Sequence, residues 1–143
     1  MTTFLLDVNV LIALADSEHT SHREATRWFR QAKSRTWATC PLTEGGMVRV
    51  MASPSYQDPS LDLTDVLAVL AALRKAPGHH FWPIDFGLAE AIAPIEARFF
   101  GHQQVTDAYL LALAVRNHGT VVTFDRGLSF LAGQEFKDSV LQL

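Results

Sequence analysis

The apolar residues of this chain fall into short runs, separated by longer segments in which apolar side chains recur at helical spacing. The run that opens residues 4–12 and those at 36–40, 79–84 and 120–124 predict strands, and the tail around 139–141 predicts an edge strand. Helices are predicted at 10–15, 22–33, 42–51, 63–75, 87–98 and 105–115, with another beginning after Asp125. This alternation predicts an α/β fold, with a parallel sheet and helices on both of its faces.

A few residues set the expected starts of these helices. Pro41 and Thr43 are start signals for the helix at 42–51. Asp85 is expected to cap the helix at 87–98, and Thr106 is expected to cap the helix at 105–115. Pro83 weakens the strand at 79–84, which favours an edge position for that strand.

Asp7 and Asn9 follow the first strand, and two interpretations of Asp7 compete. As an N-cap, Asp7 would accept backbone N–H groups at the start of the next helix, which is the commoner use of the residue. As a metal ligand, it would stand at the carboxyl edge of a central parallel strand, where open α/β sheets carry their sites. The positions of the other acidic residues decide between the two.

Further acidic residues are expected at the same edge, because right-handed crossovers bring every strand-to-helix junction to one side of the sheet. Glu44, Asp85 and Asp125 occupy such junctions, and Asp107 begins a helix that runs back before the strand at 120–124. Neighbouring strands lie about 4.8 Å apart, so an acid on an outer strand, such as Asp85, is roughly 10 Å from the centre and is excluded. The predicted catalytic residues and metal ligands are therefore Asp7, Glu44, Asp107 and Asp125.

Carboxylates crowded in this way raise one another's pKa and cost stability unless a cation lies among them. Hard oxygen ligands favour Mg²⁺, with Mn²⁺ possible, over zinc. Such a site suits phosphoryl chemistry, in which a metal activates water and stabilises the leaving oxygen. Asn9 and Thr123 are expected to orient Asp7 or the water beside it. Arg126 is either a phosphate contact or a solvated residue at a helix start.

Composition narrows the class of protein. The 143 residues suit one domain, expected at 1–143, and 48% of them are hydrophobic, enough for a folded core. The single cysteine, Cys40, excludes an internal disulfide and a cysteine-rich zinc site, and favours a reducing compartment. The first apolar run is too short to span a bilayer and lacks a basic leader, so a cytoplasmic protein without membrane association is expected.

The net charge of −3 argues against a protein that coats nucleic acid through bulk electrostatics. Basic residues are nevertheless concentrated in one segment, at Arg23, Arg27, Arg30, Lys33 and Arg35. This strip is either a solvated helix face or a surface that contacts phosphates, and the sequence leaves both alternatives open.

Four segments carry the acidic residues in a fixed order: LDVNVLI at 6–12, PLTE at 41–44, TDAYLLA at 106–112 and VTFDRGL at 122–128. Together they resemble the four acidic motifs of PIN-domain ribonucleases, and their order and spacing are most similar to the VapC toxins of bacterial toxin–antitoxin modules. The resemblance covers nearly the whole chain. One departure is Val8, where many relatives carry a Thr or Ser hydroxyl.

The resemblance implies a PIN-like three-layer fold, with a five-stranded parallel sheet in the order 3-2-1-4-5. It implies an Mg²⁺-dependent endoribonuclease whose metal-activated water leaves 5′-phosphate and 3′-hydroxyl ends. It also implies a homodimer, and a VapB-type antitoxin that inserts a segment near the acidic pocket. In such an enzyme Arg126, Arg23, Arg27 and Arg30 are candidate RNA contacts.

Two alternatives of other classes stay open. One is a degenerate PIN-like module that binds RNA or protein without cleavage, although the presence of all four acids argues against it. The other is a phosphatase of the haloacid-dehalogenase type, which also opens with an Asp at a strand end. Those enzymes need a second Asp two residues on, where this chain has Asn9.

Overall fold

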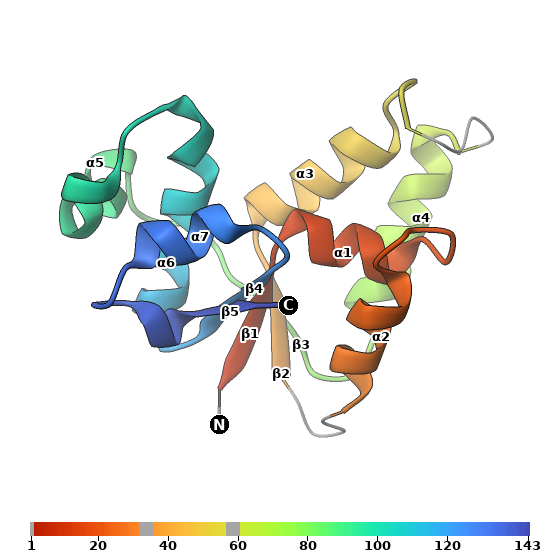
Figure 1. Cartoon of the computed structure of the whole chain (residues 1–143). Coiled ribbons are helices and arrows are strands. Elements are labelled where there is room, and N and C mark those ends of the chain that lie inside the picture. The colour runs from red at the N-terminus through yellow and green to blue at the C-terminus, as the bar shows by residue number, and fades with distance from the viewer. Residues whose placement is uncertain (1, 32–35, 57–60) are drawn as a thin grey trace.

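A parallel sheet of five strands lies at the centre of the fold, in the order β3-β2-β1-β4-β5 (Figure 1). The strands are β1 (Thr3–Leu6), β2 (Thr36–Thr39), β3 (His79–Phe81), β4 (Thr120–Thr123) and β5 (Val140–Gln142). The computed structural model describes residues 2–31, 36–56 and 61–143. The predicted strand order and the parallel pairing are both confirmed, as is the edge position of β3.

Adjacent residues of the central strands face opposite sides of the sheet, as the two-residue period of a strand requires. Leu5 and Val121 belong to one hydrophobic core, whereas Leu6 and Val122 belong to the other. Strands that are apolar on both faces are typical of parallel sheets covered by helices on each side. The fold is therefore a three-layer α/β/α arrangement.

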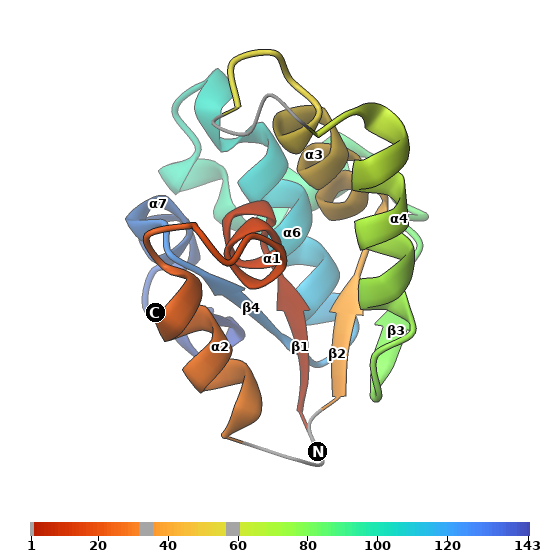
Figure 2. The ribbon, with the colours of Figure 1, turned by 90° about the vertical axis from the view of Figure 1, so that its right-hand side faces the viewer.

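Two groups of helices cover the two faces. The core that contains Leu6 is closed by α1 (Val8–Ala15), α2 (His22–Arg30), α3 (Pro41–Met51) and α4 (Leu63–Arg74). The core that contains Leu5 is closed by α5 (Leu88–Ile92), α6 (Val105–Arg116) and α7 (Arg126–Ala132). The described residues also form three 3₁₀ segments, η1 (Ala93–Arg98), η2 (His102–Gln104) and η3 (Lys137–Ser139). Figure 2 shows α1 in front of the sheet and α6 behind it.

The segment between β3 and α6 differs from the prediction. The helix expected at 87–98 is divided into α5 and η1, because Pro94 lacks the N–H that a continuous helix needs and Ile95 has non-helical angles. Gly87, not Asp85, is the N-cap residue of α5, so the predicted capping role of Asp85 is wrong. The strand β3 ends at Phe81, although the N–H of Trp82 still donates to Thr39 O at 2.8 Å.

The start of the first helix and the cap of α6 also differ from the prediction. The first helix begins at Val8, with Asp7 as its N-cap, two residues earlier than predicted. The helix α6 begins at Val105, so Thr106 lies inside its first turn and is not the cap. The predicted end of α2, together with Lys33 and Arg35, lies outside the described residues. None of the described helices is long and apolar enough to span a membrane.

Candidate active site

Asp7 lies between β1 and α1, and its carboxylate binds both α1 and the neighbouring strand β4. Its Oδ1 accepts the N–H of Val8 at 2.7 Å, and its Oδ2 accepts the hydroxyl of Thr123 at 2.7 Å. The residue is only 8% exposed. The N-cap interpretation therefore accounts for one carboxylate oxygen, while the other is directed to the end of the neighbouring strand β4.

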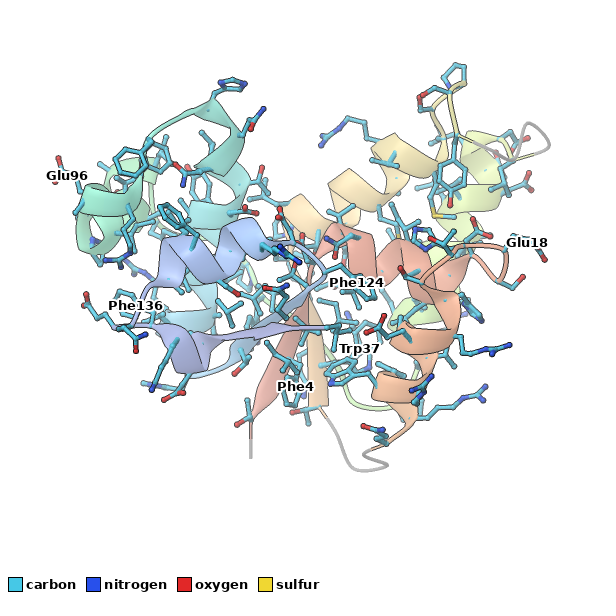
Figure 3. All side chains as sticks on the ribbon, in the orientation of Figure 1. Phe4, Glu18, Trp37, Glu96, Phe124 and Phe136 are labelled. Atoms are coloured by element: carbon cyan, nitrogen blue, oxygen red, sulfur yellow. The ribbon has the colours of Figure 1, made fainter. Side chains whose placement is uncertain are left out.

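The hydroxyl of Thr123 connects the polar residues at this edge of the sheet. It donates to Asp7 and accepts the N–H of Asp125 at 2.9 Å and the side-chain amide of Asn9 at 3.4 Å. The Oδ1 of Asn9 accepts the N–H of Phe124, which is labelled in Figure 3, at 3.3 Å. Thr123 thus contacts Asp7 as predicted, whereas Asn9 reaches Asp7 through Thr123.

Asp125 and Asp107 bring two further carboxylates to this edge. Asp125 is the N-cap of α7, and its Oδ1 accepts the N–H of Gly127 at 2.8 Å. Asp107 lies in the first turn of α6. A Cβ placed on Gly127 would lie 3.3 Å from Asp125 Oδ1 and 3.6 Å from Asp107 Oδ2. Both carboxylates therefore border the same glycine, at the point where α6 and α7 begin.

The aspartates repel one another, and their protonation reflects it. Burial, reinforced by the charges of Asp7 and Asp125, raises the pKa of Asp107 to about 7. Burial also raises the pKa of Asp7; the hydrogen bonds from Thr123 and Val8 oppose this shift, and the charge of Asp125 adds to it. The three carboxylates are thus close enough to couple electrostatically, as the expected crowding of acids at this edge requires.

These aspartates line an open cleft of about 450 Å³ between the two groups of helices. Its lining includes Asn9 and Asp125, Thr106 and Asp107 from α6, and Gly46 and Arg49 from α3. A Cβ on Gly46 would lie 2.6 Å from Cγ2 of Val8, so the missing side chain lets α3 approach the start of α1. The cleft is open to ligands and carries carboxylates on more than one wall.

Glu44 is not brought into this cluster. Its Oε2 accepts the hydroxyl of Thr39 at 2.5 Å and lies 3.5 Å from Nε of Arg74. The same Thr39 hydroxyl is 2.7 Å from Nε2 of His79. Glu44 does not line the aspartate cleft, and no charge interaction with it contributes to the pKa of Asp7 or Asp107. The structure therefore joins three of the four predicted acids and directs the fourth toward α4 and β3.

The predicted basic residues occupy different places. Arg126 is exposed at the start of α7, next to Asp125. Arg23, Arg27 and Arg30 line a separate concavity on α2, which shares no residue with the aspartate cleft. Arg49, which the sequence analysis did not single out, does line the cleft. Its spacing of three residues from Gly46 on one helix was the available signal, because such residues share a helix face.

The residues fit a hard divalent cation by their chemistry. Asp7, Asp107 and Asp125 supply carboxylate oxygens, the ligands that Mg²⁺ and Mn²⁺ prefer, and a cation would offset the burial and the neighbouring charges that together raise the pKa of Asp107. Within residues 2–31, 36–56 and 61–143, no three His, Cys, Asp or Glu side chains already stand at ligand spacing. Binding an ion therefore requires these carboxylates to move toward it.

Comparisons with known proteins identify the family of this chain. The sequence matches the PIN domain family over residues 4–133. It is 45% identical to Ribonuclease VapC39 of Mycobacterium tuberculosis over 127 residues, which cover 89% of this chain and 91% of that protein. It is 43% identical to Ribonuclease VapC38 of the same organism over 136 residues, covering 95% of this chain and 94% of that protein.

Solved structures share the fold at much lower identity. The crystal structure of Mycobacterium tuberculosis VapC20, a toxin that cleaves the sarcin-ricin loop, matches with a TM-score of 0.65 at 15% identity, over 88% of this chain and 92% of that one. A chain of VapBC2 from Rickettsia felis, solved bound to a DNA fragment from their promoter, matches with a TM-score of 0.63 at 12% identity, over 99% of each chain.

Proposed function

This chain belongs to the PIN-domain family and, within it, to the VapC ribonucleases, and from this premise we propose that it is a metal-dependent endoribonuclease of a VapBC toxin–antitoxin system. The observation that carries the proposal is the convergence of Asp7, Asp107 and Asp125 on one cleft, with the pKa of Asp107 raised to about 7. Carboxylates gathered at such a cost in repulsion are typical of sites that bind a cation.

In this proposal Asp7, Asp107 and Asp125 hold Mg²⁺ or Mn²⁺. When bound, such an ion supplies a water of lowered pKa and stabilises charge on the leaving oxygen of a phosphodiester. Thr123 donates to one oxygen of Asp7 and accepts the backbone N–H of Asp125, so it holds both residues beside the place where the ion would bind. The backbone N–H of Gly127 fixes Asp125 Oδ1 in the same way.

Incubation of the purified protein with a panel of structured RNAs tests the proposal. With Mg²⁺ or Mn²⁺ present, we expect internal cleavage that leaves 5′-phosphate and 3′-hydroxyl ends, and we expect no cleavage in excess EDTA. An RNA-binding module without activity would leave the RNA intact under both conditions. A phosphatase would release phosphate from small esters, but Asn9, hydrogen-bonded to Phe124 and Thr123, occupies the position where that class needs its second Asp.

The proposed partners follow from the family. A VapB-type antitoxin, a homodimeric assembly and a cytoplasmic location are proposals that rest on the similarity to VapC proteins and to a chain of the VapBC2 complex. Co-expression of the chain with the product of the neighbouring reading frame tests the first of these. Stable co-purification, together with loss of RNA cleavage, is the expected result.

Replacing Thr123 with valine is expected to lower RNA cleavage by about 10- to 100-fold, the usual effect of removing a residue that orients a metal ligand. The variant loses the hydroxyl that donates to Asp7 and accepts from Asp125, so its free energy of unfolding should also fall by about 1–3 kcal/mol. Cleavage kinetics and urea unfolding measure the two effects. Thr123→Ser keeps the hydroxyl and should retain most of the activity. A Thr123→Val enzyme as active as the wild type would contradict this role.

Replacing Glu44 with glutamine should reduce cleavage by only about tenfold, because the Glu44 carboxylate contacts Thr39 and Arg74 rather than the aspartates. If Glu44 instead shares the ion, as its sequence position predicts, the loss should be as large as that of an aspartate variant. Side-by-side rate measurements with Asp107→Asn separate the two. Equal losses would show that Glu44 rotates into the cleft when the ion binds.

A further inference from the structure

Arg49 projects from α3 into the lining of the aspartate cleft, and among the described residues it has no hydrogen-bond, ion-pair or ring partner. Some of the other arginines are engaged: Arg74 pairs with Glu44, and Arg116 lies 4.2 Å over the ring of Phe86. Arg98 donates to the carbonyls of Leu131 and Ala132. A guanidinium with five N–H donors and no internal partner, at the wall of an open cleft, is free to bind a ligand.

The negative charge of the cleft makes a nearby cation such as Arg49 important for binding an anionic ligand. Asp7, Asp107 and Asp125 make one end of the cleft anionic, and a phosphodiester strand entering it is repelled unless positive charge lies along its path. Arginine binds phosphate oxygens through two parallel N–H donors, which fixes the position of the phosphate as well as attracting it. A cation on the wall near the aspartates therefore favours entry of an anionic chain.

We propose that Arg49 is a positioning residue that binds a backbone phosphate next to the scissile one, holding single-stranded RNA against α3; this inference rests on the proposed ribonuclease function. Gly46, Arg49 and Val50 all line the cleft from one face of α3, at the spacing of residues one helical turn apart. Gly46 borders Val8, which follows Asp7 directly. This face of α3 thus extends from Gly46, which lies against the start of α1 beside the aspartates, to Arg49 one helical turn farther along α3.

A phosphate contact positions the strand but reads no base, so its loss should affect binding independently of sequence. Loss of Arg49 should weaken binding equally for RNAs of unrelated sequence, and for DNA of the same sequence, because both backbones carry the same phosphates. Binding of a single strand should also become less sensitive to salt, with a slope of log affinity against log salt that is smaller by about 0.7.

The test compares Arg49→Gln with Arg116→Gln, which removes the same charge at the far end of α6 from Asp107. For cleavage in Mg²⁺, we expect the KM of Arg49→Gln to rise about tenfold, with kcat changed by less than about twofold, as for a group that binds substrate and transition state equally. Each substitution is also made in an Asp107→Asn background. There, fluorescence anisotropy with labelled oligoribonucleotides of two unrelated sequences, and with the matching oligodeoxynucleotide, gives affinity and salt slope. Arg49→Lys keeps the charge without the paired donors and should give an intermediate KM.

The outcomes separate the two proposals. If Asp107→Asn is inactive while Arg49→Gln keeps the wild-type KM and salt slope, the role of Arg49 is overturned and the ribonuclease function stands. If the loss of affinity depends on RNA sequence, Arg49 reads a base and the phosphate assignment is overturned. If the wild-type protein leaves RNA intact in both Mg²⁺ and Mn²⁺, the ribonuclease function itself fails. Melting temperatures of both arginine variants check folding, and Arg49→Lys carries the test if Arg49→Gln is unstable.

Discussion

Replacing Asp107 with asparagine is expected to abolish most RNA cleavage while raising the melting temperature of the metal-free protein above pH 7. In the proposed mechanism several kcal/mol of transition-state stabilisation depend on a correctly held ion, and each 1.36 kcal/mol is tenfold in rate, so a loss on the order of a thousandfold is expected. Asparagine has nearly the shape of aspartate, and the change removes one charge from three that repel one another.

The stability effect follows from the pKa of Asp107. Because its folded-state pKa is raised from 3.8 to about 7, its contribution to stability is fully present below about pH 4 and is lost as the pH rises through about 7. Asparagine cannot ionise and escapes that loss. Allowing for solvent screening of this partly exposed group, we expect a gain of about 1–2 kcal/mol, or about 3–8 °C in melting temperature, near pH 8.

Asp85→Asn is the matched control for Asp107→Asn. Asp85 follows β3 toward the same edge of the sheet, but it is exposed and does not line the aspartate cleft. The Asp85→Asn substitution should change neither the rate of RNA cleavage nor the pH dependence of stability. Scanning fluorimetry across pH 5–8 and single-turnover cleavage measure both quantities. An Asp107→Asn protein that is destabilised to the same extent at every pH would contradict the repulsion argued here.

Millimolar Mg²⁺ or Mn²⁺ is expected to raise the melting temperature, and to do so more strongly as the pH increases. An ion that binds only the folded protein at a hundred times its dissociation constant adds about 2.7 kcal/mol, or about 5–10 °C for a chain of this size. At acid pH, protons bind Asp107 and compete with the ion, because the pKa of Asp107 is about 7. The rise in melting temperature caused by the ion should therefore be small at about pH 5.5 and reach its full size at about pH 8.

Two controls define this metal effect. Ca²⁺ at equal ionic strength separates a small octahedral site from general charge screening, because Mg²⁺ prefers shorter bonds and stricter geometry. Asp107→Asn should lose most of the Mg²⁺ increment at about pH 8. A midpoint that does not respond to Mg²⁺ or Mn²⁺ at any pH would count against a metal held by these aspartates.

Much of this site could be predicted from sequence, because its backbone positions follow from topology. Parallel strands joined by right-handed crossovers put Asp7 and Asp125 at one edge, and the direction of α6 adds Asp107. The contact between Thr123 and Asp7 could also be predicted from topology, because β1 and β4 are neighbours in the sheet. Position along a strand or helix is a local property, and here the local signals were strong.

Side-chain direction was less predictable. Glu44 begins α3 at the correct edge, but its orientation depends on Thr39, Arg74 and His79, which three other elements supply. No local pattern specifies that meeting. The break at Pro94 could have been anticipated, because a proline inside a helix removes a hydrogen bond. Arg49 was overlooked because its relation to the cleft depends on the close approach of α3 to Val8, which Gly46 permits.

The central claim is that Asp7, Asp107 and Asp125 close around one divalent cation that serves RNA cleavage. Anomalous diffraction from crystals soaked in Mn²⁺ tests it most directly. The account predicts an anomalous peak in the cleft, within bonding distance of oxygens from these aspartates, at Mn²⁺ concentrations that support cleavage. A cleft without that peak, in protein that cleaves RNA at the same Mn²⁺ concentration, would contradict it.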